Sequence, residues 1–148
     1  MSHTPLDCFF RPRHVALVGA SEKPDSVGRS ILENLTKSSF GGAVHPVNPN
    51  HQTMRGLQCY PAVNAIGSGV DLAVIATPAH TVPAVVADCG SSGVKAAIVI
   101  SAGFRETGAS GLELENRILS EARASGMRIL GPNCLGLMNP HQGLNATF

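Results

Sequence analysis

Short apolar runs alternate along the chain with segments whose apolar residues recur at helical spacing. The run His14–Gly19 is typical of a buried strand, because it is apolar almost throughout and ends at a glycine. The next segment, Val27–Lys37, carries Ile31, Leu32 and Leu35 on one face of a predicted helix. The same alternation predicts further strands at 43–47, 71–76, 95–100 and 127–130, and further helices at 82–89 and 112–125.

Glycines and prolines mark where these segments end. Gly90 and Gly93 predict the end of the helix at 82–89, and Gly126 predicts the end of the helix at 112–125. Residues 48–70 contain several prolines and glycines and predict a loop with at most one short strand or helical turn. The regular alternation of strand and helix predicts an α/β fold: a Rossmann-like, doubly wound, mainly parallel sheet with helices on both faces. The 148 residues are the usual length of one such domain.

Composition and charge narrow the class of protein. The net charge of +1 provides no basic field that would attract nucleic acid or an anionic membrane. No apolar run is long enough to span a bilayer, and the N-terminus lacks the basic and apolar regions of a signal peptide. The four cysteines form no C-x-x-C pair. We therefore expect a cytoplasmic protein with reduced thiols, no nucleic-acid partner and no membrane.

The segments that follow the five predicted strands are the candidate ligand site, because doubly wound sheets bind ligands beyond the carboxyl ends of their strands. These segments carry small residues, hydroxyls, amides and prolines, and no carboxylate. Such a rim accepts an anionic ligand and offers no acid–base pair, so we predict no catalytic residue and no metal ligand. The segments contain Gly19, Ala20 and Ser21; Asn48, Pro49 and Asn50; Thr77 and Pro78; Ser101, Ala102 and Gly103; and Asn133 and Cys134.

The turn from Gly19 to Gly28 joins a predicted strand to a predicted helix. Gly19 permits a tight exit, Ser21 has a hydroxyl that can donate to a phosphate, and Gly28 allows a close backbone approach. Free N–H groups at the first turn of the helix, at the positive end of its dipole, suit a diphosphate. An ordinary strand-to-helix loop with a glycine exit has the same pattern, so the turn alone leaves both interpretations open.

The pattern argues against two common nucleotide sites. The dinucleotide fingerprint requires G-x-G-x-x-G and an acidic residue about 20 positions further on. Here Ser21 replaces the second glycine, and no acidic residue follows the second strand until Asp71. The chain has no Gly-Lys-Ser/Thr, which excludes a P-loop.

The histidines, Cys134 and Phe104 can each be explained by a structural role. No histidine has a second ligand at metal spacing, so surface or capping roles are favoured for all six. Cys134 has no histidine placed to activate it, which favours a buried, unreactive thiol. Phe104 is either a lid over a ligand or an ordinary packing aromatic.

Six motifs occur in an order that resembles a known family. They are Val18-Gly-Ala-Ser21 with Val27-Gly28; Pro46-Val-Asn-Pro49; Asp71-Leu-Ala-Val-Ile75 with Thr77-Pro78; Ser101-Ala-Gly-Phe104; Gly131-Pro-Asn-Cys-Leu-Gly136; and Gly143-Leu-Asn-Ala-Thr-Phe148. Together they resemble the N-terminal CoA-binding domain of the NDP-forming acyl-CoA synthetase superfamily. That superfamily includes the succinyl-CoA synthetase α subunit, ADP-forming acetate–CoA ligases and protein lysine acetyltransferases with a fused GNAT domain. The resemblance extends from about Phe9 to Phe148.

The resemblance implies coenzyme A or acyl-CoA as the ligand. By position, it implies a diphosphate site in the first turn and a ribose and adenine edge after the second strand. It also implies a pantetheine path along the next two turns and a thiol end after the last strand. In that order the residues are Gly19, Ala20, Ser21, Val27 and Gly28; Asn48, Pro49 and Asn50; Thr77, Pro78, Ser101, Ala102 and Gly103; and Asn133 and Cys134.

One position departs from the family pattern. Asn50 stands where members commonly have lysine, so a cation for the CoA 3′-phosphate is missing unless Lys23, Arg29 or Arg55 supplies it. Without one, CoA binding would be weaker by an amount on the order of 1 kcal/mol.

The family's catalytic machinery lies in later domains. The resemblance therefore implies that residues 1–148 are a catalytically silent N-terminal fragment, whose partners are the downstream domains or subunit of a longer protein. That parent would be an ADP-forming acid–CoA ligase, or a GNAT-fused acetyltransferase in which this domain is regulatory. An NAD-binding regulatory Rossmann domain and an interaction protein with a degenerate site are the alternatives.

Overall fold

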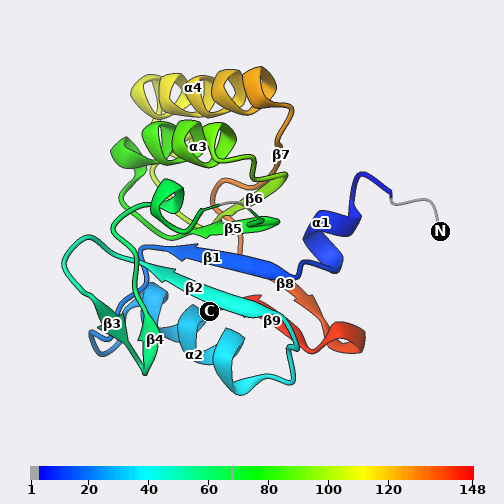
Figure 1. The fold of residues 1–148 in the computed structure, drawn as a ribbon. Coiled ribbons are helices and arrows are strands. Elements are labelled where there is room, and N and C mark those ends of the chain that lie inside the picture. The colour runs from blue at the N-terminus through cyan, green and yellow to red at the C-terminus, as the bar shows by residue number, and fades with distance from the viewer. Residues whose placement is uncertain (1–3, 68) are drawn as a thin grey trace.

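The computed structural model describes residues 4–67 and 69–148. Five strands form the central sheet, and three longer helices connect them (Figure 1). In chain order these elements are β1 (His14–Val18), α2 (Val27–Lys37), β2 (Ala43–Val47), β5 (Leu72–Ile75), α3 (Val82–Ser91), β6 (Ala96–Val99), α4 (Ala109–Ser125) and β7 (Arg128–Leu130).

The smaller elements are one short helix, two hairpins and four 3₁₀ turns. They are α1 (Asp7–Phe10), the hairpin β3 (Thr53–Met54) with β4 (Leu57–Gln58), the hairpin β8 (Gly136–Asn139) with β9 (Leu144–Thr147), and the turns η1 (Val63–Ala65), η2 (Ala79–Thr81), η3 (Arg105–Thr107) and η4 (Pro140–Gln142).

The central sheet is entirely parallel and has the strand order β2-β1-β5-β6-β7. The chain moves outward from β1 to β2 and then crosses back to β5, so the strand order reverses between β1 and β5. This reversal is the position at which open α/β sheets bind ligands. The predicted Rossmann-like, doubly wound fold is confirmed.

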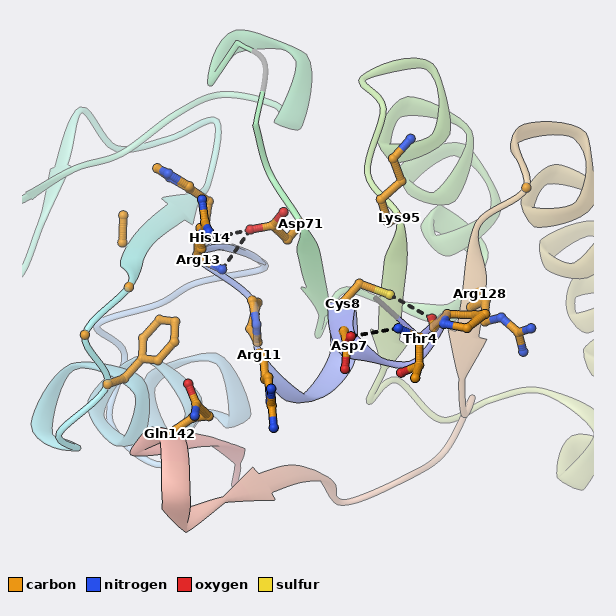
Figure 2. Close-up of a pocket in the computed structure, with 17 residues that line it drawn as sticks. Thr4, Asp7, Cys8, Arg11, Arg13, His14, Asp71, Lys95, Arg128 and Gln142 are labelled. Carbon is orange, nitrogen blue, oxygen red and sulfur yellow. Dashed lines mark hydrogen bonds between the residues drawn. The ribbon is translucent and has the colours of Figure 1, made fainter. Parts of the chain in front are cut away.

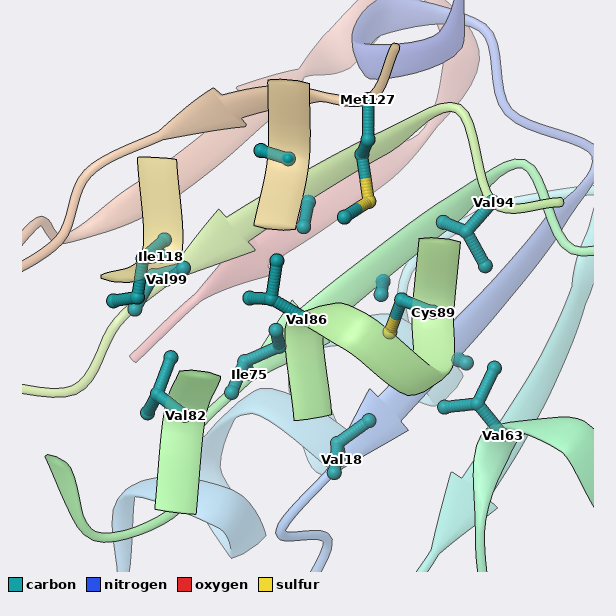
Figure 3. Close-up of a cluster of buried hydrophobic side chains, with 14 of the residues drawn as sticks. Val18, Val63, Ile75, Val82, Val86, Cys89, Val94, Val99, Ile118 and Met127 are labelled. Carbon is teal, nitrogen blue, oxygen red and sulfur yellow. The ribbon is translucent and has the colours of Figure 1, made fainter. Parts of the chain in front are cut away.

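The sheet separates two apolar cores, because successive residues of a strand point to opposite faces. On one face Val18, Ile75 and Val99 pack with residues of α3 and α4, as Figure 3 shows around Val86 and Ile118. On the other face the sheet packs against α2, against β9 and against Phe9 of α1. The β8–β9 hairpin takes part in covering this second face, and Asn34 of α2 donates to the Thr147 carbonyl at 2.9 Å.

The strand and helix bounds agree closely with the sequence pattern at α2 and β2, and differ elsewhere. α3 continues through Gly90 to Ser91, whereas the pattern predicted that Gly90 ends it. A side chain at Gly90 would meet Ser125 of α4 at 2.6 Å, so this glycine serves close helix packing. α4 begins three residues before the predicted Leu112, and its Gly111 lies against the Phe104 carbonyl.

The hairpins β3–β4 and β8–β9 and the helix α1 were not predicted as such. Each is only two to four residues per segment, which is too short for a periodic pattern to emerge. No helix within residues 4–67 and 69–148 is long and apolar enough to cross a membrane.

Candidate functional site

A cavity of about 350 Å³ opens at the carboxyl edge of the sheet, where β5, β6 and β7 end. Six of the residues predicted from the sequence line it, and they come from four separate segments of the chain. Four more residues line it that were not among the predicted site residues: Ala76, Ile100, Leu135 and Phe148. The complete lining is Val27, Ala76, Thr77, Ile100, Ser101, Ala102, Asn133, Cys134, Leu135 and Phe148.

The turn between β1 and α2 is packed tightly at the point where the strand order reverses. Gly19 has a φ of +89°, and a side chain there would lie 2.7 Å from the Ala76 carbonyl oxygen, at the end of the neighbouring strand. A side chain at Gly28 would lie 2.0 Å from the Gly19 carbonyl oxygen. The two glycines therefore let the first turn of α2 lie directly against the exit of β1.

The hydroxyls of this turn are partly used in holding its shape. Ser21 Oγ accepts the Lys23 N–H at 3.0 Å, and Ser26 Oγ caps α2 by accepting the Arg29 N–H at 3.3 Å. The first helical hydrogen bond is donated by Ser30. Within residues 4–67 and 69–148, the N–H groups of Val27 and Gly28 have no protein acceptor. These two donors lie at the positive end of the helix dipole, which is favourable for an anion.

Asn48, Pro49 and Asn50 lie beside this turn and not in the cavity. Asn48 Nδ2 donates to the Ala20 carbonyl at 2.9 Å, and its Oδ1 accepts the Asn50 N–H at 2.9 Å. The Asn48 side chain therefore joins the exit of β2 to the turn after β1. Asn48 is half-buried, whereas Pro49 and Asn50 are exposed.

Hydrogen bonds link the exits of β5, β6 and β7 to one another. Ser101 Oγ donates to the Thr77 carbonyl at 2.5 Å, and the Asn133 N–H donates to the Ser101 carbonyl at 3.0 Å. Thr81 Oγ1 donates to Thr77 Oγ1 at 2.8 Å. Thr77, Ser101 and Asn133 thus form a connected rim. Ala102 also lines the cavity, whereas Pro78 and Gly103 lie outside its lining.

Cys134 places a neutral thiol in the cavity wall. Its Sγ lies 3.4 Å from the Val99 carbonyl oxygen, to which it can donate. Burial raises the pKa of the Cys134 thiol above its usual value, so the reactive thiolate is disfavoured at neutral pH. This agrees with a packing role for the sulfur.

Three cations were candidates to replace the lysine that Asn50 lacks, and the structure distinguishes them. Arg29 and Arg55 both contact Glu33, at 3.0 and 2.9 Å. The hydrogen bond from Arg29 is the main reason why the pKa of Glu33 is lowered. Lys23 is exposed and makes no ion pair within the described part of the chain. It is therefore the candidate whose charge remains available.

Glu106 is a carboxylate near the rim that the strand-end segments did not include. Its Oε1 accepts the Gly103 N–H at 2.6 Å. That hydrogen bond, followed by those from the backbone of Glu106 and Phe104, lowers the pKa of Glu106. Phe104 is fully buried among the core residues of α3 and α4, so it is a packing aromatic and not a lid.

A second, larger groove of about 1180 Å³ lies at the opposite edge of the sheet, where the strands begin (Figure 2). Arg11, Arg13, Lys95 and Arg128 line it. Asp71 also lines it and accepts the Arg13 and His14 N–H groups at 2.7 and 3.0 Å. None of the predicted site residues lies there.

Comparison with known proteins agrees with the fold. The family described as "CoA binding domain" matches residues 13–140. The chain is 45% identical over 143 residues to the α subunit of an ADP-forming acetate–CoA ligase II from Pyrococcus furiosus. This match covers 97% of the chain and 31% of that relative. An ADP-forming acetate–CoA ligase from Methanocaldococcus jannaschii is 46% identical over 137 residues, which are 93% of the chain and 19% of that protein.

A solved structure shows the same fold. The dinucleotide-forming acetyl-coenzyme A synthetase 1 of Candidatus Korarchaeum cryptofilum, in complex with phosphate and ADP, superposes with a TM-score of 0.92 at 44% identity. The match covers 96% of this chain and 30% of that one. The chain therefore belongs to the CoA-binding domain family, as the domain is found in ADP-forming acyl-CoA synthetases. It spans about a third or less of the length of these relatives.

Proposed function

We propose that the chain binds coenzyme A, free or as an acyl thioester, along the carboxyl edge of the sheet. The diphosphate would lie at the β1–α2 turn, with the adenosine end beside Asn48, Pro49 and Asn50. The pantetheine arm would pass Thr77 and Pro78 and then Ser101, Ala102 and Gly103. The thiol or thioester would reach the cavity wall at Asn133 and Cys134. The observation that carries this proposal is the cavity itself, since it joins the exits of three strands to the first turn of α2.

The parent protein that we propose is an ADP-forming acid–CoA ligase, in which this domain holds CoA for later domains or a second subunit. The relatives with this activity support it. No observation favours an acetyltransferase parent or an NAD-binding domain, since residues 48–70 contain no acidic residue to hold an NAD ribose. We include a cytoplasmic location in the proposal, because all four cysteines are free thiols.

Lys23 is the residue that we propose for the CoA 3′-phosphate. It lies on the turn whose Ala20 carbonyl receives the Asn48 amide, and therefore at the adenosine end of the proposed site. An exposed charge pair contributes about 0–1 kcal/mol, which corresponds to at most about a fivefold change in affinity. Lys23→Gln should bind CoA only as well as the wild type binds dephospho-CoA.

Isothermal titration of the chain with CoA, dephospho-CoA and NAD tests the proposal. Ala102→Leu fills the exposed side of the cavity and should weaken CoA binding by about tenfold or more, since it removes space that the ligand needs. Ala124→Leu is the matched control, because Ala124 is exposed on α4, outside the cavity lining. Binding of NAD without CoA, or equal CoA affinity in both variants, would contradict the proposed site.

A further inference from the structure

The turn after β6 is held by a carboxylate that does not line the cavity. Glu106, in η3, reaches back along the chain, and its Oε1 accepts the Gly103 N–H at 2.6 Å. Hydrogen bonds from N–H groups to an ionised carboxylate are stronger than those to a neutral acceptor. The lowered pKa of Glu106 indicates that the carboxylate is ionised at neutral pH and that the backbone N–H groups stabilise it in that form.

Both ends of this turn are anchored independently of Glu106. At the start, Ser101 is bonded to the Thr77 carbonyl and to the Asn133 N–H. At the other end, Phe104 is fully buried. The next residue, Arg105, is fixed by Glu115, whose two carboxylate oxygens each lie 2.9 Å from the Arg105 Nε.

The middle of the turn has fewer restraints. Gly103 has a φ of +108°, a conformation that only glycine adopts readily, and a side chain there would lie 3.0 Å from the Ala79 Cβ. Within the described residues, the acceptor of the Gly103 N–H is the Glu106 carboxylate. Without that acceptor, the peptide between Ala102 and Gly103 would be free to rotate between two fixed ends.

We propose that Glu106 is the positioning residue of the pantetheine path. Its carboxylate fixes the Gly103 peptide, and this sets the direction in which Ala102, between the anchored Ser101 and Gly103, faces the cavity. Glu106 itself does not contact the ligand. The inference rests on the proposed CoA site and assigns to it a residue that the strand-end pattern did not include.

Removing the Glu106 carboxylate would have a different consequence if it served only as a structural cap of the turn than if it positions the turn for the ligand. Loss of a cap lowers the stability of the whole domain and weakens every ligand alike. Loss of a positioning residue weakens the part of the ligand that lies on the turn. Adenosine 3′,5′-bisphosphate separates the two cases, because it carries the adenosine end of CoA without the pantetheine arm.

The experiment compares CoA and adenosine 3′,5′-bisphosphate by calorimetry on the wild type, Glu106→Gln and Glu106→Ala. Glu113→Ala is the matched control, since Glu113 is an exposed carboxylate on α4 with no ion pair in the part of the chain that is described. We expect Glu106→Ala to lose about tenfold in CoA affinity. Glu106→Gln should lose less, because its amide oxygen can still accept the Gly103 N–H.

The bisphosphate should bind equally to all four proteins. Equal losses for both ligands would show that Glu106 is only a structural cap, and an unchanged CoA affinity in folded Glu106→Ala would overturn the positioning role. Absence of CoA binding in the wild type would instead overturn the proposed CoA site, and the role of Glu106 with it. Thermal unfolding of each variant establishes that the compared proteins are folded.

Discussion

Gly28 shows how one residue can make the β1–α2 turn possible. Its φ is not in the left-handed region, so its need for glycine comes from the neighbouring backbone alone: a Cβ atom would lie 2.0 Å from the Gly19 carbonyl oxygen and 3.3 Å from the Ser21 nitrogen. Backbone atoms of a tight turn cannot move aside as the end of a side chain can. The glycine therefore sets the distance between α2 and the exit of β1.

We predict that Gly28→Ala destabilises the domain by about 1–3 kcal/mol, the usual cost of forcing extra atoms into a packed region. It should also abolish CoA binding. The new Cβ would push the first turn of α2, with its N–H groups, away from the exit of β1, and the proposed diphosphate site needs the two together. Urea unfolding and CoA titration measure the two effects. Gly41→Ala is the control, since a Cβ at Gly41 has no atom within 4 Å. Equal stability of the two variants would contradict the prediction.

His45 introduces a dependence of stability on pH. Burial, and then the charge of His14, lower the pKa of His45 below its usual value near 6.5. The two rings are stacked, with His14 Nδ1 and His45 Nε2 3.1 Å apart, and His45 also contacts the edge of Tyr60. The folded state therefore favours a neutral His45, while the unfolded chain binds a proton near pH 6.5.

Because the unfolded state binds more protons in this range, stability must fall as the pH decreases from above 6.5 toward the lowered pKa of folded His45. Urea unfolding between pH 8 and pH 5 measures this decrease. His45→Gln should be less sensitive to pH over the same interval, because it removes the titrating ring. A wild type whose stability does not change across the interval would show that the His45 pKa is not lowered.

The element scale shows what the hydrophobic pattern could and could not predict. Strand β2 and helix α2 were predicted at their observed bounds, since two glycines directly precede the strand and the helix has a clear apolar face. The end of α3 was predicted wrongly at Gly90. A glycine that ends a helix and a glycine that admits a neighbouring helix look alike in a sequence, and the contact with Ser125 lies 35 positions away.

The same limit decided which residues of the candidate site could be predicted from the sequence. Thr77, Ser101 and Asn133 were found because they directly follow apolar strands, and the sheet brings strand ends together. Leu135 and Phe148 were missed because they reach the cavity through the β8–β9 hairpin, whose long-range pairing leaves no local signal. Glu106 was missed because its contact depends on a turn conformation, and not on its distance from a strand end.

The packing of α3 against α4 yields a prediction at this scale. Replacing a helical glycine by alanine normally stabilises a helix by about 0.5–1 kcal/mol. At Gly90 the new Cβ would lie 2.6 Å from Ser125 Oγ and 2.7 Å from Ser125 Cβ, so Gly90→Ala should instead destabilise the domain by about 1–3 kcal/mol.

A double-mutant cycle tests the cause. In the background of Ser125→Gly, which removes both atoms of the clash, Gly90→Ala should become neutral or stabilising. The free energies of unfolding of the four proteins in the cycle give the coupling between the two positions. Additive effects of the two substitutions would mean that Gly90 is required for some reason other than the approach of α4.

At the scale of the whole molecule, the two edges of the sheet offer different surfaces to a ligand. The amino edge has the larger groove, which is lined by four basic side chains. Their positive charge makes this groove an alternative binding site for a polyanion such as CoA. At the carboxyl edge Val27, Leu135 and Phe148 border the cavity with exposed fractions of 37%, 72% and 51%. These exposed apolar side chains, together with the free N–H groups at the start of α2, fit a ligand that has a diphosphate at one end and an uncharged thioester arm at the other.

Amide hydrogen exchange in the presence and absence of saturating CoA distinguishes the two edges. A ligand stabilises the folded state and lowers local opening most strongly where it makes contact. Amides that exchange by local opening should therefore slow in the β1–α2 turn and in the exits of β5, β6 and β7. Those of residues 11–14 and 126–128, at the amino edge, should keep their rates. Protection confined to the amino edge would place the polyanion in the basic groove, and the carboxyl-edge cavity would then need another ligand.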